Sequence, residues 1–166
     1  MQEYFYSEKI ISDIHFIVIT DGEALKQVLI NSALPSFSQN LIRTEPSDKK
    51  LLKTFSQLEE YFNKKRKEFS IPLNPDGTEF QKKVWNELIK ITYGKTISYE
   101  QLAERVGNLK SIRAVGKANG ANPIPVIIPC HRVIGKNGSL VGYSAGLEIK
   151  KKLLNLEKGL ELNLFA

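Results

Sequence analysis

Residues 71–77, with the sequence IPLNPDG, interrupt the regular patterns on both sides of them. Two prolines and an Asp-Gly pair are typical of turns and linkers, and they do not fit the interior of a helix or a central strand. A chain of 166 residues is long enough for one domain or for two small ones. We therefore predict an N-terminal domain over residues 1–75 and a C-terminal domain over residues 76–166.

Charge is distributed unevenly between these two parts. The net charge is +6. Residues 1–75 carry 10 basic and 10 acidic side chains, whereas residues 76–166 carry 14 basic and 8 acidic ones. A basic domain beside a neutral one indicates a polyanionic partner such as nucleic acid, although a solvated lysine-rich surface gives the same count.

The composition excludes several classes of protein. No apolar run approaches the roughly 18 residues that span a bilayer, and the N-terminal residues MQEYFYSEKI lack the basic and apolar regions of a signal peptide. A single cysteine excludes an intramolecular disulfide, and one cysteine with two histidines disfavours a zinc site. We expect a cytoplasmic protein with no membrane partner, no metal and no cofactor.

The N-terminal part contains candidate strands and one candidate helix. Residues 14–20 (IHFIVIT) are apolar and mostly β-branched, which predicts a strand. Residues 3–11 and 27–30 are weaker strand candidates. Residues 49–64 carry apolar side chains at helical spacing, so we predict a helix there.

The C-terminal part begins with helical patterns. Thr78 is a candidate N-cap for a helix that we expect to end at residues 93–95. Residues 98–101 match a capping box and predict a short helix that stops at residues 107–108. A second short helix is predicted over residues 111–119. Two short helices joined by a glycine-containing turn match a helix-turn-helix, although many helical hairpins share this pattern.

The second of these helices has an unusual composition. Residues 113–120 (RAVGKANG) are mostly small, with basic side chains between them. Such a helix can form a tight helix–helix contact. It can also lie against a nucleic-acid groove, where lysine and arginine meet phosphates.

The only cysteine, Cys130, follows a proline-punctuated apolar run over residues 122–129. We expect this run to be extended and buried, with prolines that fix the approach of the chain to Cys130. A lone buried cysteine is most often an inert small side chain. The adjacent His131 and Arg132 could instead favour a reactive thiolate. Contact between Cys130 and His131 would need a turn or a bridging water, because neighbours on a strand point to opposite faces.

The string PCHR at residues 129–132, after NPIP at residues 122–125, resembles the active-site motif of the methylated-DNA–protein-cysteine methyltransferases, or O6-alkylguanine-DNA alkyltransferases. The resemblance implies an α/β fold: a small N-terminal α/β domain with a ribonuclease H-like sheet, and a mostly helical C-terminal domain with a helix-turn-helix. It covers roughly half of the chain, in matching order. Further matching residues are Phe80, Gln81, Val84, Trp85, Gly94, Ile97, Ser98, Tyr99, Leu102, Ala103, Arg113, Ala114, Val115, Gly116, Gly142, Tyr143, Ser144, Gly146, Leu147, Leu153, Leu154 and Glu157.

The resemblance implies transfer of an alkyl group from O6 of guanine in duplex DNA to Cys130, which acts once and is consumed. His131 is the implied base that takes the thiol proton through a water, and Glu157 orients His131 as the third member of a triad. Without the family, Glu157 would be interpreted as a solvated helix residue. Asn122 holds the geometry near Cys130, and Tyr99 assists the leaving base. The implied alkylguanine pocket is formed by Val133, Tyr143 and Ser144.

O6 lies inside a stacked duplex, so the nucleotide must be flipped out. Arg113 is the implied residue that enters the stack and fills the vacancy. Ala114, Gly116 and Ala118 would be small because their helix presses into the minor groove, whereas most helix-turn-helix proteins use the major groove. The partner would be duplex DNA containing O6-alkylguanine, bound by a monomer. The remaining implied DNA contacts are Ser98, Tyr99, Asn108, Lys117, Arg132 and Lys136, of which Arg132 could equally be a structural ion-pair partner.

Three other functions remain open from the residues alone. A non-enzymatic protein that binds alkylated DNA would have replaced Cys130. A thiol hydrolase using Cys130 and His131 lacks a recognisable oxyanion loop. A plain helix-turn-helix regulator leaves the PCHR segment unexplained. The chain departs from the family at Glu100, where an uncharged polar residue is common and an acid is unfavourable beside DNA phosphates.

Overall fold

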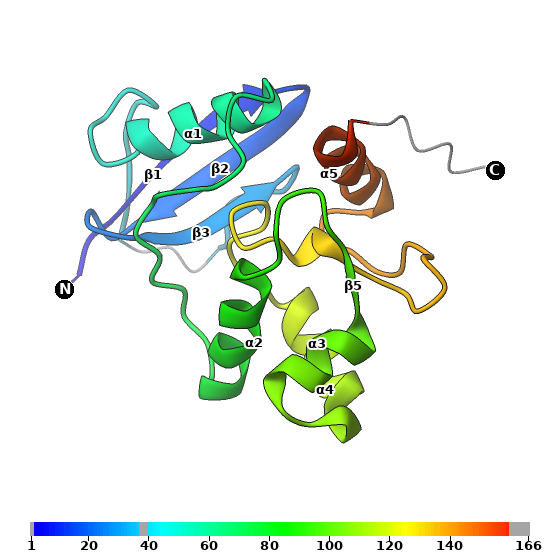
Figure 1. The fold of residues 1–166 in the computed structure, drawn as a ribbon. Helices are drawn as coiled ribbons and strands as arrows, with labels where there is room; N and C mark the ends of the chain where they lie inside the picture. The colour runs from blue at the N-terminus through cyan, green and yellow to red at the C-terminus, as the bar shows by residue number, and fades with distance from the viewer. Residues whose placement is uncertain (1, 37–39, 160–166) are drawn as a thin grey trace. The chain divides into compact units, whose positions relative to one another are not determined.

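A computed structural model describes residues 2–36 and 40–159 of the chain (Figure 1). Its contacts divide the chain into two compact units, Met1–Asp76 and Gly77–Ala166. Each unit has its own core. Within the described residues, no helix is both long and apolar enough to cross a bilayer.

The first unit is built on a four-stranded sheet with the order β3-β2-β1-β4. Strands β1 (Tyr4–Ile11) and β2 (Ile14–Thr20) form an antiparallel hairpin. Strand β3 (Leu25–Ile30) pairs with β2 in the antiparallel sense, and the short β4 (Leu41–Arg43) runs parallel to β1. The prediction of a strand over residues 14–20 is confirmed. The two weaker strand candidates are also strands, whereas β4 was not predicted.

Helix α1 (Leu52–Phe62) packs on this sheet, where the ring of Phe62 meets that of Phe16 at 5.7 Å (Figure 1). The helix is shorter than the predicted 49–64. It begins late because residues 48–51 form a turn, in which the Leu51 amide donates to Asp48. It ends early because Lys64 has a positive φ of 59°, which a helix cannot contain.

The start of the predicted linker is fixed to the sheet rather than free. The Leu25 amide donates to the Pro72 carbonyl at 2.8 Å, and the Asn74 amide donates to the Leu25 carbonyl at 2.9 Å. Asp76 also forms an ion pair of 2.7 Å with Lys26. The segment thus extends the first unit by a short pairing before the second unit begins at Gly77.

The second unit packs its first three helices against one another. The indole nitrogen of Trp85 donates to the Ala118 carbonyl at 2.8 Å and joins the first of these helices to the third. The elements of this unit are α2 (Glu79–Ile89), β5 (Ile97–Ser98), α3 (Tyr99–Val106), the 3-10 turn η1 (Leu109–Ser111), α4 (Ile112–Gly120), the 3-10 turn η2 (Cys130–Arg132), β6 (Val133–Ile134) and α5 (Leu147–Lys158).

The predicted helix starts are confirmed in this unit. Thr78 and Ser98 each accept from the amide three residues later and each complete a capping box with a glutamine. Gly107 ends α3 in the left-handed conformation, with φ 97°. Helix α2, however, ends at Ile89 rather than at residues 93–95, because the Ile91 amide turns back to Leu88.

The apolar run before Cys130 is buried, as predicted, but it is not extended. The Ile128 amide donates to the Ile124 carbonyl at 2.9 Å, which closes a turn, and Val126 takes a positive φ of 74°. The side chain of Asn122 supplies the reason. Its amide nitrogen donates to Ile128 O at 2.7 Å and its oxygen accepts from Ile124 N at 3.0 Å, so it holds both ends of the turn.

We expect Thr78→Ala to lower the free energy of unfolding by about 1 kcal/mol, because it removes the acceptor for the Gln81 amide at the start of α2. Urea unfolding followed by Trp85 fluorescence measures this. The matched control is Thr92→Ala, which removes an exposed threonine outside any cap. Equal losses in the two variants would contradict the capping role.

Candidate active site

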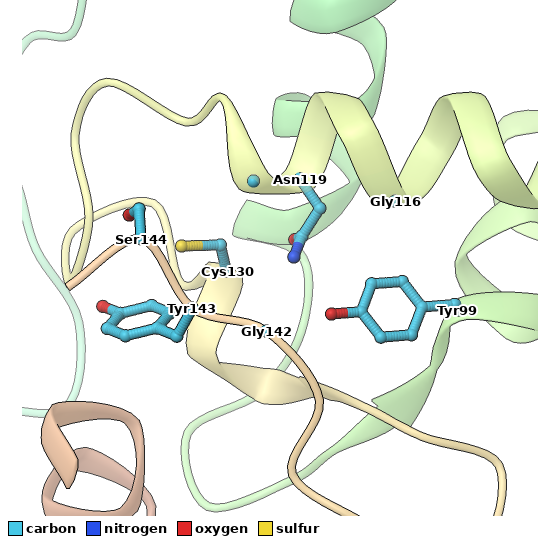
Figure 2. A pocket seen from close by; sticks show the side chains of 8 residues that line it. Tyr99, Gly116, Asn119, Cys130, Gly142, Tyr143 and Ser144 are labelled. Carbon is cyan, nitrogen blue, oxygen red and sulfur yellow. The ribbon is translucent and has the colours of Figure 1, made fainter. Parts of the chain in front are cut away.

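One pocket of about 200 Å³ contains the only cysteine (Figure 2). In Figure 2 the carboxamide of Asn119 and the hydroxyl of Tyr99 point toward a common space, and the sulfur of Cys130 points toward Tyr143 and Ser144. The structure therefore brings together most of the predicted pocket residues. Val133, which is fully buried, is not among the residues that line this pocket. The lining residues are Tyr99, Gly116, Asn119, Gly120, Cys130, Gly142, Tyr143 and Ser144.

Short parallel pairing between β5 and β6 brings these residues together. Ile97 pairs with Val133 and Ser98 with Ile134, so the start of α3 lies beside the segment that follows Cys130. The Tyr99 hydroxyl then donates to the Val141 carbonyl at 3.1 Å. Tyr99 is thereby tied to the loop that carries Tyr143 and Ser144.

Cys130 is 2% exposed, and burial raises the pKa of its thiol to about 11. A hydrogen bond with Asn122 and the charge of Lys150 act in the opposite direction without cancelling the effect of burial. At neutral pH the free protein therefore holds a thiol rather than a thiolate. A reaction at Cys130 requires a group that removes the proton.

The group next to Cys130 that can do so is His131, which is fully buried. Its Nε2 lies 2.7 Å from Glu157 Oε1. The η2 turn points the imidazole toward α5, and α5 presents Glu157 on its buried face. The solvated position considered for Glu157 from the sequence is thus wrong, and the pairing with His131 that the family resemblance implies is present.

The charge of Glu157 sets the tautomer of His131. Burial alone would raise the pKa of Glu157, but hydrogen bonds from His131 and Arg132 and the charge of Arg132 outweigh it and hold this pKa far below its usual value. Burial lowers the pKa of His131, so the imidazole is neutral. An ionised carboxylate only accepts, so Nε2 carries the hydrogen. Nδ1 is then the basic nitrogen, and it is buried without a hydrogen-bond partner among the described residues.

The predicted DNA contact of Arg132 is wrong. Arg132 is 6% exposed, and its Nε and Nη2 donate to the two carboxylate oxygens of Glu157, both at 2.9 Å. Its Nη1 donates to Ile91 O at 2.6 Å. All three guanidinium nitrogens are hydrogen-bonded inside the protein, so Arg132 is a structural ion-pair partner, which was the alternative considered from the sequence. Its charge is balanced by Glu157, and Lys150 is the cation that acts on Cys130.

The surface of α4 fits the predicted DNA-facing helix only in part. Arg113, Ala114 and Lys117 are exposed, and Gly116 lies beside the Tyr99 ring. Ala118 is 3% exposed, and its backbone carbonyl accepts from the Trp85 indole. The predicted contact of Ala118 with DNA is therefore wrong, and its small size serves helix packing.

Three further predicted contacts lie near α3 and α4. Asn108 is exposed and caps η1, where its side chain accepts from the Lys110 amide. Ser98 caps α3. Lys136 is exposed and pairs at 3.2 Å with Glu100, the residue that departs from the family pattern. A neighbouring lysine thus offsets part of the acidic charge of Glu100.

Sequence reasoning missed Asn119 and Lys150. Asn119 is 4% exposed, lines the pocket, and its Oδ1 has no hydrogen-bond partner among the described residues. Lys150 is fully buried. The spacing of Lys150, Leu153, Leu154 and Glu157 was a usable signal, because it places both charged residues on the apolar face of one helix.

The described residues contain no group of side chains that is suited to binding a metal ion. Across residues 2–36 and 40–159, no three His, Cys, Asp or Glu side chains are grouped so that they could hold a metal ion.

Comparisons with known proteins agree with this architecture. Residues 79–159 match the family model for the 6-O-methylguanine DNA methyltransferase DNA binding domain, and residues 14–75 match the model for the ribonuclease-like domain of the same family. The chain therefore belongs to the 6-O-methylguanine DNA methyltransferase family. The predicted α/β fold, with a ribonuclease H-like N-terminal domain and a helical C-terminal domain, is confirmed.

Individual relatives support the same assignment. The methylated-DNA–protein-cysteine methyltransferase of Methanosarcina acetivorans is 57% identical over 101 residues, and the constitutive one of Bacillus subtilis is 53% identical over 103 residues. These matches cover 61% of this chain in both cases, and 65% and 62% of the two relatives. The chain thus spans less than two thirds of their length.

Solved structures match over more of the chain. The Mycobacterium tuberculosis O6-methylguanine methyltransferase superposes with a TM-score of 0.86 at 34% identity, covering 94% of this chain and 93% of that one. The Mycobacterium tuberculosis OGT in complex with DNA gives a TM-score of 0.83 at 35% identity, covering 95% and 93%.

We expect Glu157→Gln to lower the free energy of unfolding by about 3–5 kcal/mol at neutral pH, because it leaves Arg132 buried without its counter-charge. The pKa of Glu157 is lower in the folded than in the unfolded protein. The stabilisation is therefore complete above the ordinary value of 4.5 and is lost as the pH falls below it. Urea unfolding of wild type and variant at several pH values measures the difference.

The control is Glu148→Gln, at an exposed position in the first turn of the same helix. A difference between wild type and Glu157→Gln that stays constant down to acid pH would contradict the buried ion pair.

Proposed function

We propose that this protein repairs DNA by transferring the alkyl group of an O6-alkylguanine in duplex DNA to Cys130. The observation that carries the proposal is the pocket, which places Cys130 against Gly116, Asn119 and Gly120 of α4. A duplex bound along α4 can deliver an extrahelical base directly to the thiol. The match to the DNA binding domain of this family supports the same arrangement.

The reaction follows from the protonation states. Nδ1 of His131 takes the thiol proton of Cys130 through a bridging water, and Glu157 stabilises the resulting imidazolium. The sulfur attacks the alkyl carbon, a carbon–sulfur bond forms, and the bond from that carbon to O6 breaks. The electron pair of the broken bond stays with guanine.

Tyr99 is the proposed donor to the departing guanine. Burial and the neighbouring Cys130 raise the pKa of Tyr99, so its hydroxyl remains protonated at neutral pH. It donates to guanine after it has turned away from the Val141 carbonyl. Guanine leaves as the neutral base once it has gained this proton, which Tyr99 recovers from solvent. The thioether at Cys130 has no nearby group that could break it, so each molecule acts once.

Base flipping is assigned to α4. Arg113 stands exposed in its first turn and is the proposed residue that fills the vacancy in the stack, with Ala114 and Gly116 allowing close approach to the minor groove. Binding that ignores sequence rests on phosphates, so affinity falls with salt. Proposed phosphate contacts are Ser98, Tyr99, Asn108, Lys117 and Lys136.

In this proposal residues 76–166 form the domain that carries both DNA binding and alkyl transfer, and residues 1–75 form the accompanying domain. The net charge of +6 suits a polyanionic partner. We propose that the protein acts as a monomer in the cytoplasm, without metal or cofactor.

Incubation with duplex DNA containing one O6-methylguanine tests the proposal by intact-protein mass. We expect one methyl group on each wild-type molecule, no turnover beyond one equivalent, and no mass gain in Cys130→Ala. Tight binding to the lesion without a mass gain would support a non-enzymatic lesion-binding protein instead. A protein that neither binds the lesion nor gains mass would refute the proposed role in DNA repair.

We expect Arg113→Ala to slow transfer from duplex DNA about tenfold or more, because the flipped state loses the side chain that fills the stack, while transfer from free O6-methylguanine base stays unchanged. Single-turnover rates on both substrates measure this. Arg105→Ala, at an exposed arginine in the last turn of α3, is the matched control. Equal slowing of Arg113→Ala on the two substrates would contradict a role in flipping.

A further inference from the structure

Lys150 is a lysine with no exposed surface. Its Nζ donates to three backbone carbonyls, Val133 O at 2.7 Å, Val141 O at 3.0 Å and Gly142 O at 3.2 Å. An ammonium group has three donors, and all three are used. Burying a charge is costly unless its hydrogen bonds are satisfied, so this arrangement is a specific one.

These carbonyls belong to separate walls of the pocket. Val133 follows the η2 turn that carries Cys130. Val141 and Gly142 lead into Tyr143 and Ser144, which line the pocket. Val141 O also accepts from the Tyr99 hydroxyl, so the same carbonyl links Lys150 to the start of α3.

The charge of Lys150 acts on Cys130. Interaction with Lys150 lowers the pKa of the thiol, and Cys130 correspondingly raises the pKa of Lys150, which burial brings down to about 8. The other titratable groups of this region are Tyr99 on α3, Tyr143 on the loop, His131 and Arg132 on η2, and Glu157 on α5. Glu157 is bonded to Arg132 and His131, which leaves the Lys150 charge available to Cys130.

We propose that Lys150 is a positioning residue for alkyl transfer, which fixes the loop at residues 141–144 against Val133 and supplies the positive charge that favours the Cys130 thiolate. The role in transfer from DNA rests on the proposed function. The effect on the ionisation of Cys130 does not.

The test compares Lys150→Met, which keeps the length of the side chain and removes its charge, with Lys151→Met on the half-buried next position of α5. Carbamidomethylation of Cys130 by iodoacetamide is followed by intact mass at about pH 7, where Lys150, with a pKa of about 8, is charged. We expect the rate to fall about tenfold in Lys150→Met, because less of the thiol ionises without the nearby charge, and to match wild type in Lys151→Met. Methyl transfer from O6-methylguanine duplex should fall about tenfold or more only in Lys150→Met.

A folded Lys150→Met protein whose carbamidomethylation rate and transfer rate equal those of Lys151→Met would overturn the proposal. If wild type reacts with iodoacetamide but takes no methyl group from DNA, the proposed function fails, and the change in carbamidomethylation rate still decides the effect of Lys150 on Cys130.

Circular dichroism shows whether Lys150→Met folds. Should it not fold, the nitrogen-15 NMR signal of the Lys150 ammonium in wild type replaces it. We expect the pH midpoint of this signal to fall when Cys130 has been carbamidomethylated, because Cys130 raises the pKa of Lys150. A midpoint that does not change on carbamidomethylation would refute the electrostatic role.

Discussion

The second unit of this protein depends on one buried carboxylate. Glu157 accepts from His131, from two nitrogens of Arg132 and from the backbone amide of Gly94. These donors come from the cysteine-bearing turn and from the loop after α2, so a single side chain of α5 joins three segments that are far apart in the sequence. The desolvation of two charges is offset only because each oxygen of the carboxylate is bonded. Removing either Arg132 or Glu157 would leave the other as a buried charge without compensation.

The same carboxylate explains how a buried cysteine can serve as a nucleophile. Burial keeps Cys130 as a thiol and His131 as a neutral imidazole, so the free protein carries no exposed thiolate that would react with other electrophiles. Glu157 fixes the hydrogen of His131 on Nε2 and leaves Nδ1 as a base. In the proposed transfer, the thiolate forms only when the alkylated base occupies the pocket. A raised thiol pKa is thus compatible with reactivity that is confined to the bound lesion.

The sequence predicts those features that are decided locally. The capping boxes at Thr78 and Ser98 and the buried strand at residues 14–20 follow from short patterns, and the PCHR motif identified the family and predicts Cys130 as the nucleophile. Features decided by packing were not predictable. Which side of α4 is buried depends on Trp85, so Ala118 was misassigned. The turn before Cys130 depends on both hydrogen bonds of the Asn122 side chain. Arg132 and Lys150 satisfy their charges with groups more than five residues away in the sequence.

The central claim is that Glu157 holds His131 in the tautomer whose Nδ1 can accept a proton. Nitrogen-15 NMR of the His131 imidazole at neutral pH tests it most directly, because protonated and unprotonated ring nitrogens differ in chemical shift. The account predicts a neutral ring with its hydrogen on Nε2 and an unprotonated Nδ1. A ring with its hydrogen on Nδ1, or an imidazolium at neutral pH, would contradict it.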